Sequence, residues 1–341
     1  MRFALVGLAA AALALAGPVG AFAQQRTLTV YSSLDEEQAK ALIKGFEAKN
    51  PEIKINAILG STAPIIARVI AEAAAPQADV ILGNAVSALM SADAKGLLLA
   101  YKPANYDKVS PLMRDARPDP VWVGVDAWAS SVCYNKIEGE KRNIPAPKTW
   151  ADLTKPEYKG QITMPSPLSS GTALLAVNGW LTIFGEQGGW DFMDKLHANV
   201  ATYGHSGSAP CRQAAAGEFV IGISYATPGV KLINEGAPIS IVLPEEGLGW
   251  EIEAVSIVKG AKNLDDAKKL ADWASSREAA EISAKYLPMS AYDDIQSLPK
   301  NYPAGEKEKL LKMDFTKLSA NREAVMAEWQ KRYGTKVPPK K

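Results

Sequence analysis

Hydroxyl and amide side chains gather in short turns that follow expected strands and precede expected helices. Such turns place unpaired backbone N–H groups and the positive end of a helix dipole beside the side-chain donors, an arrangement that favours an anion. Lys and Arg are nearly absent from them, so the sequence predicts that phosphate, phosphonate or carboxylate is held by hydrogen bonds. The five turns are Ser32-Ser33, Gly60-Ser61-Thr62, Gly83-Asn84, Ser169-Ser170-Gly171-Thr172 and Ser206-Gly207-Ser208.

Helix capping is the alternative interpretation of each turn, because Ser, Thr and Asn are preferred N-cap residues. The five turns together favour a ligand site, since the carboxyl ends of parallel strands border one crevice. The candidate ligands of the oxyanion are Ser33, Ser61, Thr62, Asn84, Ser169, Ser170, Thr172, Ser206 and Ser208.

A second set of residues is suited to a cation. Asp126 and Trp128 lie between two expected strands and suit an ammonium group through ion pairing and a cation–π contact. Glu251 and Glu253 alternate at the start of a later strand, where they either meet an amine or face solvent. Tyr225 ends a strand, and its phenol either enters the crevice or belongs to the core.

Signals for enzymatic chemistry are weak. The segment Gly204–Ser208 resembles a nucleophile elbow, but its last residue is Ser rather than Gly. His205 is the immediate neighbour of Ser206, which leaves His197, on an expected helix, as the base of a serine hydrolase. With two Cys and two His in the chain, a Cys/His zinc site is close to excluded, and no cofactor is expected.

The elements that must position these residues alternate between strand and helix. The 341 residues are 47% hydrophobic and carry a net charge of +1, which predicts a water-soluble globular protein and argues against nucleic-acid binding. The length favours two lobes, and the β-turn-α units predict an α/β fold with parallel strands. The expected strands are Leu28–Ser32, Ile53–Leu59, Ala78–Leu82, Gln161–Met164, Asn199–Tyr203 and Val220–Ser224.

Three further strands are expected to cross between the lobes: Val121–Val125, Ser130–Tyr134 and Ile252–Val258. Lobe 1 is then predicted to comprise residues 24–125 and about 251–300, and lobe 2 residues 126–250 and about 301–341. Ser33 with Glu36 fits a capping box before the first helix.

Residues 1–23 have the form of a secretory signal. A positive start precedes an apolar run over residues 3–16, and Ala21-Phe22-Ala23 predicts cleavage after Ala23. An uncleaved anchor is the alternative, although the run is shorter than a membrane span. Export makes a disulfide between Cys133 and Cys211 reasonable, with two buried thiols as the alternative.

The mature chain resembles the periplasmic solute-binding proteins of ABC importers, in the family that includes ferric-iron, thiamine, polyamine and 2-aminoethylphosphonate binders. The resemblance implies a type II-like, two-lobe fold that closes around a ligand, a monomer in the periplasm, a membrane permease as partner and no catalysis. It is carried by residues 30–34, 78–80, 132–136, 147–153, 158–160, 217–218 and 251–260.

The resemblance also favours one ligand. Iron-binding members typically have two adjacent tyrosines where this chain has Ser224-Tyr225. The segment 247–254, Gly-Leu-Gly-Trp-Glu-Ile-Glu-Ala, is similar to that of 2-aminoethylphosphonate binders. The leading hypothesis is therefore 2-aminoethylphosphonate or a related organophosphonate, with ferric iron, a polyamine or thiamine as alternatives.

Overall fold

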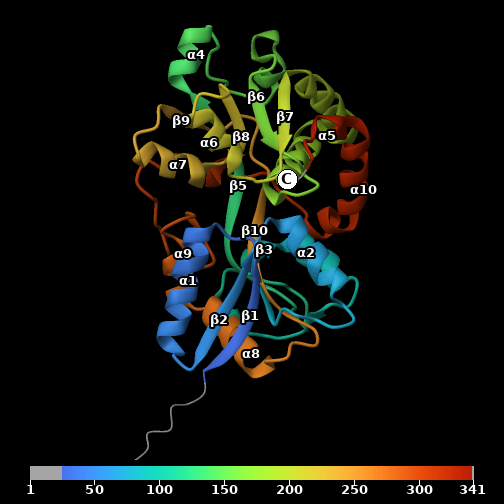
Figure 1. Ribbon diagram of the computed structural model, residues 1–341, viewed down its shortest axis with the longest axis vertical. Helices are drawn as coiled ribbons and strands as arrows, with labels where there is room; N and C mark the ends of the chain where they lie inside the picture. The colour runs from blue at the N-terminus through green and yellow to red at the C-terminus, as the bar shows by residue number, and fades with distance from the viewer. Residues whose placement is uncertain (1–24, 340–341) are drawn as a thin grey trace, which may run out of the picture.

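The computed structural model describes residues 25–339, so the expected signal segment 1–23 lies outside the described residues. Two groups of strands flanked by helices lie end to end (Figure 1). Two long strands, β5 (Val123–Asn135) and β10 (Trp250–Val258), occupy the centre of the strand order β2-β1-β3-β10-β5-β8-β6-β7. This mixed sheet with helices on its faces confirms the expected α/β class.

The first group, which we call lobe 1, is built from β-turn-α units in which β1 pairs in parallel with β2 and β3. Strand β10 closes this group by pairing antiparallel with β3. Its elements are β1 (Arg26–Ser32), α1 (Glu36–Lys49), β2 (Ile53–Leu59), α2 (Thr62–Ala71), β3 (Val80–Ala85), α3 (Val86–Asp93), β4 (Leu98–Leu99), α8 (Leu264–Ala274), α9 (Arg277–Ser283) and β11 (Met289–Ser290).

The second group, lobe 2, has β6 parallel to β7 and β8, while β5 runs antiparallel to β8 and β9. Its elements are α4 (Lys136–Arg142), β6 (Ile162–Pro165), α5 (Gly171–Asn199), β7 (Val200–Gly204), α6 (Ala209–Ala215), β8 (Ile221–Tyr225), α7 (Ala226–Asn234) and β9 (Ile239–Val242).

The last long helix, α10 (Phe315–Tyr333), contacts both α3 of lobe 1 and α5 of lobe 2. Within residues 25–339, no helix combines the length and the apolar character of a membrane span. Short 3-10 helices occur at Tyr106–Lys108, Pro111–Met113, Ala151–Thr154, Pro156–Tyr158, Lys307–Lys309 and Gly334–Lys336.

Strand β5 corrects one prediction. The sequence predicts two strands separated by Asp126-Ala127-Trp128, but the strand is continuous through these residues and every residue in it is buried. Its first half pairs with β10 and its second half with β8 and β9, so partners on both sides hold the whole length extended. Since β5 passes through both lobes, the exact lobe boundaries near residues 125 and 250 stay a prediction.

Two local predictions at the strand ends are also wrong. Helix α1 begins at Glu36 after Asp35, and the Ser33 hydroxyl donates to the Gly83 carbonyl at 2.7 Å instead of capping the helix. Gly83 and Asn84 belong to β3, which continues to Ala85 because β10 pairs with it that far.

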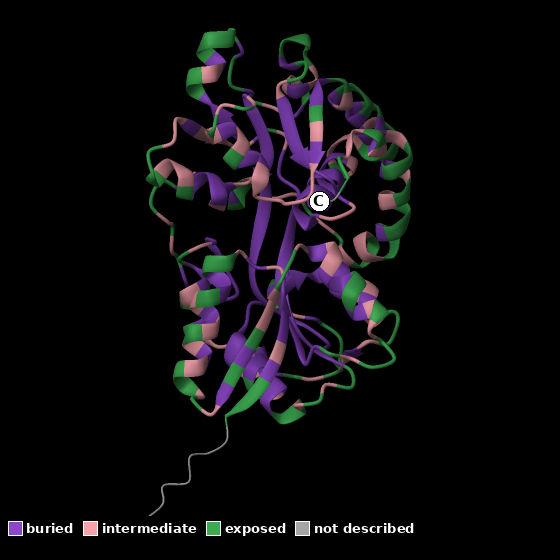
Figure 2. Cartoon of the chain, viewed as in Figure 1, coloured by how far each residue is buried: buried purple, intermediate pink, exposed green. Residues whose placement is uncertain are grey.

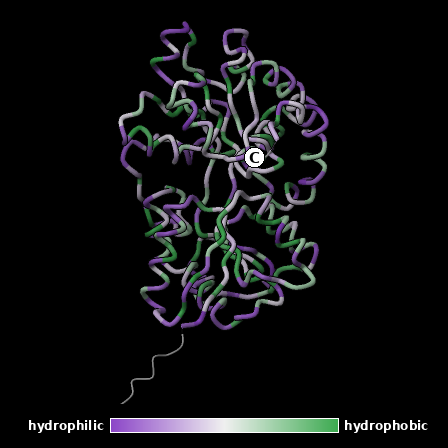
Figure 3. The backbone as a smooth tube through the Cα atoms, viewed as in Figure 1, coloured by the Kyte–Doolittle hydropathy of each residue, from purple (hydrophilic) through white to green (hydrophobic). Residues whose placement is uncertain are grey.

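The buried residues run from one lobe to the other without a break along β5 and β10 (Figure 2). Hydrophobic residues concentrate along the central strands, while many of the outer loops and helical turns are hydrophilic (Figure 3). The two central strands therefore belong to one continuous core that joins the lobes.

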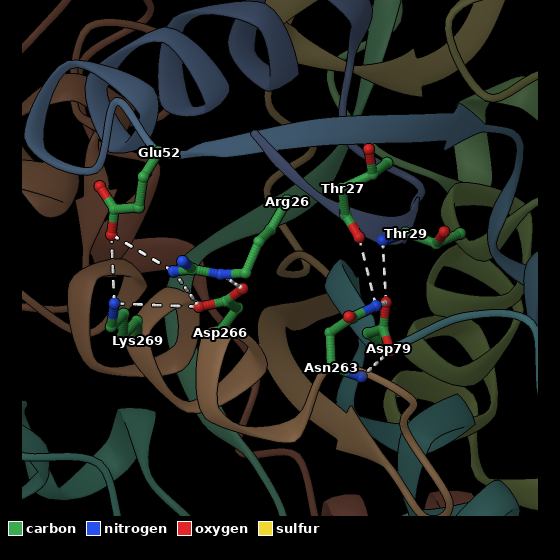
Figure 4. A network of polar contacts seen from close by, with 8 residues as sticks. All are labelled: Arg26, Thr27, Thr29, Glu52, Asp79, Asn263, Asp266 and Lys269. Atoms are coloured by element: carbon green, nitrogen blue, oxygen red, sulfur yellow. Dashed lines mark hydrogen bonds and ion pairs between the residues drawn. The ribbon is translucent and has the colours of Figure 1, made fainter. Parts of the chain in front are cut away.

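A polar network fixes the start of β1 in lobe 1 (Figure 4). Arg26 binds Asp266 of α8 through two N–H groups, at 2.7 and 3.0 Å. The buried Asp79 carboxylate accepts from the backbone N–H groups of Thr29 and Asn263, both at 2.9 Å. These bonds hold α8 against the parallel strands whose opposite ends carry the polar turns.

Cys133 of β5 and Cys211 of α6 are joined by a disulfide within lobe 2, with their Cα atoms 5.3 Å apart. We expect that denatured, unreduced protein contains no titratable thiol and that reduction exposes two. Thiol titration with a chromogenic disulfide reagent measures this directly, and two thiols before reduction would contradict the bond.

Candidate functional site

A cavity of about 310 Å³ lies between the lobes. Its wall is built mainly from the polar turns of both lobes and from the central strands. The lining residues are Ser33, Leu34, Asp35, Glu36, Gln38, Leu59, Gly60, Ser61, Thr62, Trp128, Ser170, Gly171, Thr172, Ser206, Gly207, Ser208, Tyr225, Glu253 and Leu287.

Three serines stand at the N-caps of the helices that begin at this cavity. Ser61 precedes α2, Ser170 precedes α5 and Ser208 precedes α6, and within residues 25–339 none of their hydroxyls caps its own helix. Elsewhere in the chain, Ser276 does cap its helix through its side chain. Capping therefore does not account for these three hydroxyls, and the first N–H groups of α2 and α5 also remain for a ligand. At α6 the Ala209 N–H donates to the Ser206 carbonyl at 3.4 Å, and Pro210 has no N–H.

The turns of the two lobes approach one another closely. A Cβ atom built on Gly171 of lobe 2 would lie 2.5 Å from Thr62 Oγ1 of lobe 1. A Cβ atom on Gly207 would lie 2.5 Å from Thr172 Oγ1. Both glycines are thus required by space, and they allow the three turns to form one continuous surface of hydrogen-bond donors.

Positively charged side chains support this surface without lining the cavity. Among the residues that the structure describes, no Lys or Arg lines the cavity. Arg212 lies on α6 and donates to Ser208 Oγ at 2.8 Å, while Ser206 and Ser208 share a hydrogen bond at 3.3 Å. An anion here would be held by hydroxyl and backbone donors, with Arg212 acting through Ser208.

Carboxyl and aromatic groups form the other part of the wall. The Tyr225 hydroxyl of lobe 2 donates to Asp35 Oδ2 of lobe 1 at 2.5 Å. Burial raises the pKa of Asp35, and burial together with the Asp35 charge raises the pKa of Tyr225. Trp128 adds an aromatic side chain to the same cavity.

Glu253 lines the cavity, and Asp126 lies behind it as its cross-strand partner on β5. Asp126 is fully buried, and its Oδ2 accepts hydrogen bonds from Gln38 Nε2 and Ser283 Oγ. Burial raises the pKa of Asp126 to about 6. Burial and the neighbouring Asp126 raise the pKa of Glu253 well above its ordinary value.

The structure thus gathers most of the predicted residues around one cavity. Ser33, Ser61, Thr62, Trp128, Ser170, Thr172, Ser206, Ser208, Tyr225 and Glu253 line it, and Asp126 supports Glu253.

Besides Asp126, three predicted residues do not line the cavity. Asn84 is buried in β3 and donates to the Thr62 carbonyl at 3.4 Å, which supports the turn from behind. The Ser169 hydroxyl donates to the Ser166 carbonyl at 3.4 Å. Glu251 is buried, with Ser87 and Arg322 as its polar neighbours, and burial raises its pKa to about 7.

Among the polar residues of the wall, the sequence reasoning missed Asp35, Glu36 and Gln38, while it named Gly171 and Gly207 only as parts of the turns. Asp35 carried a usable signal, because it is an acidic residue directly after a strand and before a helix. Gln38 carried none, since it occupies an ordinary position in the first turn of α1.

The geometry around Ser206 does not form a nucleophile and base. His197 Nδ1 bonds to the Tyr203 hydroxyl at 2.8 Å, and His205 Nε2 bonds to the Pro338 carbonyl at 3.0 Å. In residues 25–339, no cluster of three or more His, Cys, Asp or Glu residues is suited to a metal ion.

Comparison with known proteins places these features in a wider group. The bacterial extracellular solute-binding protein family matches residues 75–318. A Haemophilus influenzae protein without an assigned function is 32% identical over 333 residues, covering 94% of both chains. A probable ABC transporter periplasmic-binding protein of Sinorhizobium fredii is 26% identical over 297 residues, covering 85% of this chain and 79% of its own.

A solved structure is similar over nearly the whole fold. The periplasmic binding protein AfuA from Actinobacillus pleuropneumoniae, determined with exogenous fructose-6-phosphate bound, superposes with a TM-score of 0.85 at 31% identity. The match covers 91% of this chain and 99% of AfuA.

Proposed function

We propose that this chain, which belongs to the bacterial extracellular solute-binding protein family, captures 2-aminoethylphosphonate or a closely related aminophosphonate. The family assignment makes it a solute-binding protein rather than an exported hydrolase. The observation that carries the choice of ligand is the division of the cavity into a donor-rich part and a carboxyl-rich part.

The donor-rich part suits the phosphonate. Hydroxyls of Ser61, Thr172 and Ser206 and the starts of α2 and α5 face one space, from both lobes. A tetrahedral oxyanion can accept several hydrogen bonds at once, and bonds to a charged acceptor are stronger than neutral ones.

The carboxyl-rich part suits the amine. Asp35 and Glu253 line it, with Trp128 and Tyr225 as aromatic neighbours. A buried ammonium group needs an anionic or strongly polar partner, because its desolvation is costly. A ligand with an anion at one end and a cation at the other satisfies both parts of the cavity.

A sugar phosphate is the second candidate, and the fructose-6-phosphate bound to AfuA favours it. The same donors would hold its phosphate, and the carboxyl groups would accept hydrogen bonds from sugar hydroxyls. It supplies no positive charge to the carboxyl-rich part of the cavity, and for that reason we place it second.

Ferric iron, a polyamine and thiamine fit the cavity less well. Ferric iron would find a single phenol, that of Tyr225, where Ser224 is the preceding residue. A polyamine would leave the donor-rich turns without an anion, and thiamine without phosphate would do the same.

Capture would work through closure of the lobes. A ligand that contacts turns of both lobes binds the closed form more tightly and therefore shifts the population toward it. The relative from Sinorhizobium fredii supports delivery of the closed complex to the permease of an ABC importer. We further propose that the chain acts as a monomer in the periplasm after cleavage following Ala23.

Calorimetric titration tests the ligand. We expect 2-aminoethylphosphonate to bind about a hundredfold more tightly than methylphosphonate or inorganic phosphate, corresponding to roughly 2.8 kcal/mol. Fructose 6-phosphate is titrated in parallel, at one pH and one salt concentration. Equal affinity for phosphate and the aminophosphonate would remove the amine from the proposal, and tighter binding of fructose 6-phosphate would establish the second candidate.

A further inference from the structure

We propose that the carboxyl pair Asp126–Glu253 holds one proton in the free protein and releases it when a ligand ammonium group binds. This inference rests on the proposed function, because it concerns the part of the cavity assigned to the amine. The inference adds that binding of the amine displaces a proton from the protein, so the affinity for an amine-bearing ligand depends on pH.

The first observation is an unsatisfied carboxyl group on the cavity wall. Glu253 is 9% exposed, it lines the cavity, and its Oε2 has no hydrogen-bond partner among the described residues. A buried polar atom without a partner is costly, so an occupant of the cavity that donates a hydrogen bond there is favoured.

The second observation is that the neighbouring carboxyl group, that of Asp126, also has an oxygen atom without a hydrogen-bond partner in the described part of the chain. Asp126 Oδ1 also lacks a partner among residues 25–339, although Gln38 and Ser283 both donate to its Oδ2. Asp126 and Glu253 are cross-strand neighbours whose carboxyl groups interact directly. One proton shared between the two groups supplies the missing donor.

The surroundings do not neutralise two negative charges. Asp35, directly before α1, adds a third carboxyl group, and Ser283 of α9 presents a hydroxyl. The hydroxyl of Tyr225 on β8 donates to Asp35. Burial raises the pKa of both Asp35 and Tyr225, and the positive charge of Arg212 on α6 acts in the opposite direction. Burial, the charge of Glu306 and that of Asp126 all raise the pKa of Tyr302, whose hydroxyl donates to the buried carboxyl group of Glu306.

Adjacent buried carboxyl groups without a cation do not both ionise, since the like charges repel and both are desolvated. Burial raises the pKa of Asp126 to about 6, although its hydrogen bonds with Glu253, Ser283 and Gln38 act in the opposite direction. Burial and the Asp126 charge raise the pKa of Glu253 well above its ordinary value. An ammonium group supplies both the positive charge and N–H donors. The ligand keeps its three protons, and the proton of the pair passes to solvent.

The sign of the pH dependence follows from this exchange. Below the pKa of the pair's shared proton, amine binding must remove that proton, so affinity increases as pH rises, by up to about tenfold per pH unit. At a pH where the pair is already ionised in the free protein, the affinity for the amine no longer changes with pH through this pair. A neutral hydroxyl at the same position requires no proton release, so phosphate esters of sugars gain nothing from higher pH through this pair.

The experiment counts protons by calorimetry at pH 7 in buffers of different ionisation enthalpy. Ethylphosphonate serves as the reference ligand, because its phosphonate also titrates but it has no amine. The ammonium group makes the phosphonate of 2-aminoethylphosphonate more acidic, so each free ligand is titrated first and the protons that its own phosphonate releases are subtracted. After this subtraction, we expect binding of 2-aminoethylphosphonate to release up to one proton more than binding of ethylphosphonate. If it binds more tightly without additional release, the proton exchange is wrong and the proposed function stands. If it binds no more tightly than ethylphosphonate, the proposed function fails.

Matched variants assign the effect to the pair. Glu253→Gln keeps the shape but has no proton to exchange, so we expect the additional release to disappear and 2-aminoethylphosphonate affinity to fall about ten- to thirtyfold. Ethylphosphonate affinity should remain, which also shows that the variant is folded. Asp126→Asn should abolish the additional release as well.

The control is Glu251→Gln, two residues earlier on β10, whose buried carboxyl group does not line the cavity. It should leave both affinities and the proton count unchanged. An undiminished proton release in both Glu253→Gln and Asp126→Asn would overturn the assignment to this pair.

Discussion

Replacing Thr172 and Ser206 together by alanine is expected to weaken phosphonate binding by a factor of several hundred or more. Both residues line the cavity, and a Cβ atom built on Gly207, the residue after Ser206, would lie 2.5 Å from Thr172 Oγ1. Loss of one hydrogen bond to a charged group costs about 1.5–3 kcal/mol, so the two together cost roughly 3–6 kcal/mol if they are independent. Each single variant should lose about ten- to a hundredfold.

Titration of ethylphosphonate and 2-aminoethylphosphonate into the double variant measures this effect. Ser169→Ala is the matched control, because its hydroxyl bonds to the Ser166 carbonyl outside the cavity. The control should bind both ligands as the parent does. If the double variant also retains full affinity for both, the oxyanion does not lie at these turns.

The general position of the site could be predicted because it depends on chain order alone. Parallel strands joined by helices bring their carboxyl ends to one edge of a lobe, so the sequence predicts that Ser33 lies near Ser61 in lobe 1. It likewise predicts that Ser170 lies near Ser206 in lobe 2, without any knowledge of distances. The direct evidence that the hydroxyls of Ser61 and Ser170 are not caps required the structure, since capping depends on the local backbone.

The residues that the sequence misplaced depend on contacts between distant segments. Glu251 and Glu253 have the same side-chain type and alternate on one strand, but Glu251 lies beside Ser87 and Arg322, which come from α3 and α10. The sequence pattern divides β5 at Asp126 because an aspartate is uncommon inside a strand. In the folded chain, Gln38 and Ser283 donate to Oδ2 of that carboxylate and the strand continues.

The glycines of the site are visible in the sequence, but their role is not. The sequence pattern indicates that small residues such as Gly171 and Gly207 let a ligand approach the backbone. The structure shows that they make room for neighbouring protein side chains: Gly171 for Thr62 of the opposite lobe, and Gly207 for Thr172. Such a requirement is set by the approach of two lobes, and spacing along the chain does not reveal it.

Gly171→Val is therefore expected to reduce ligand affinity by about a thousandfold or more. A Cβ atom at this position would lie 2.5 Å from Thr62 Oγ1 and 3.1 Å from Thr62 Cβ, distances that require the lobes to move apart. The ligand would then lose its hydrogen bonds to one lobe, and two or three such bonds correspond to a thousandfold or more. Gly171→Ala should give a smaller loss, because alanine adds only the Cβ atom.

Two measurements separate loss of closure from loss of folding. Small-angle scattering should show that saturating 2-aminoethylphosphonate compacts the parent protein and leaves Gly171→Val unchanged, while thermal melts of the two free proteins stay similar. Gly204→Ala, at the end of β7, is the control, since a Cβ atom there has no neighbour within 4 Å among the described residues. It should bind and compact as the parent does. A Gly171→Val protein that binds and compacts normally would show that the ligand-bound state does not require the contact between Gly171 and Thr62, and closure would then have to proceed through other surfaces of the two lobes.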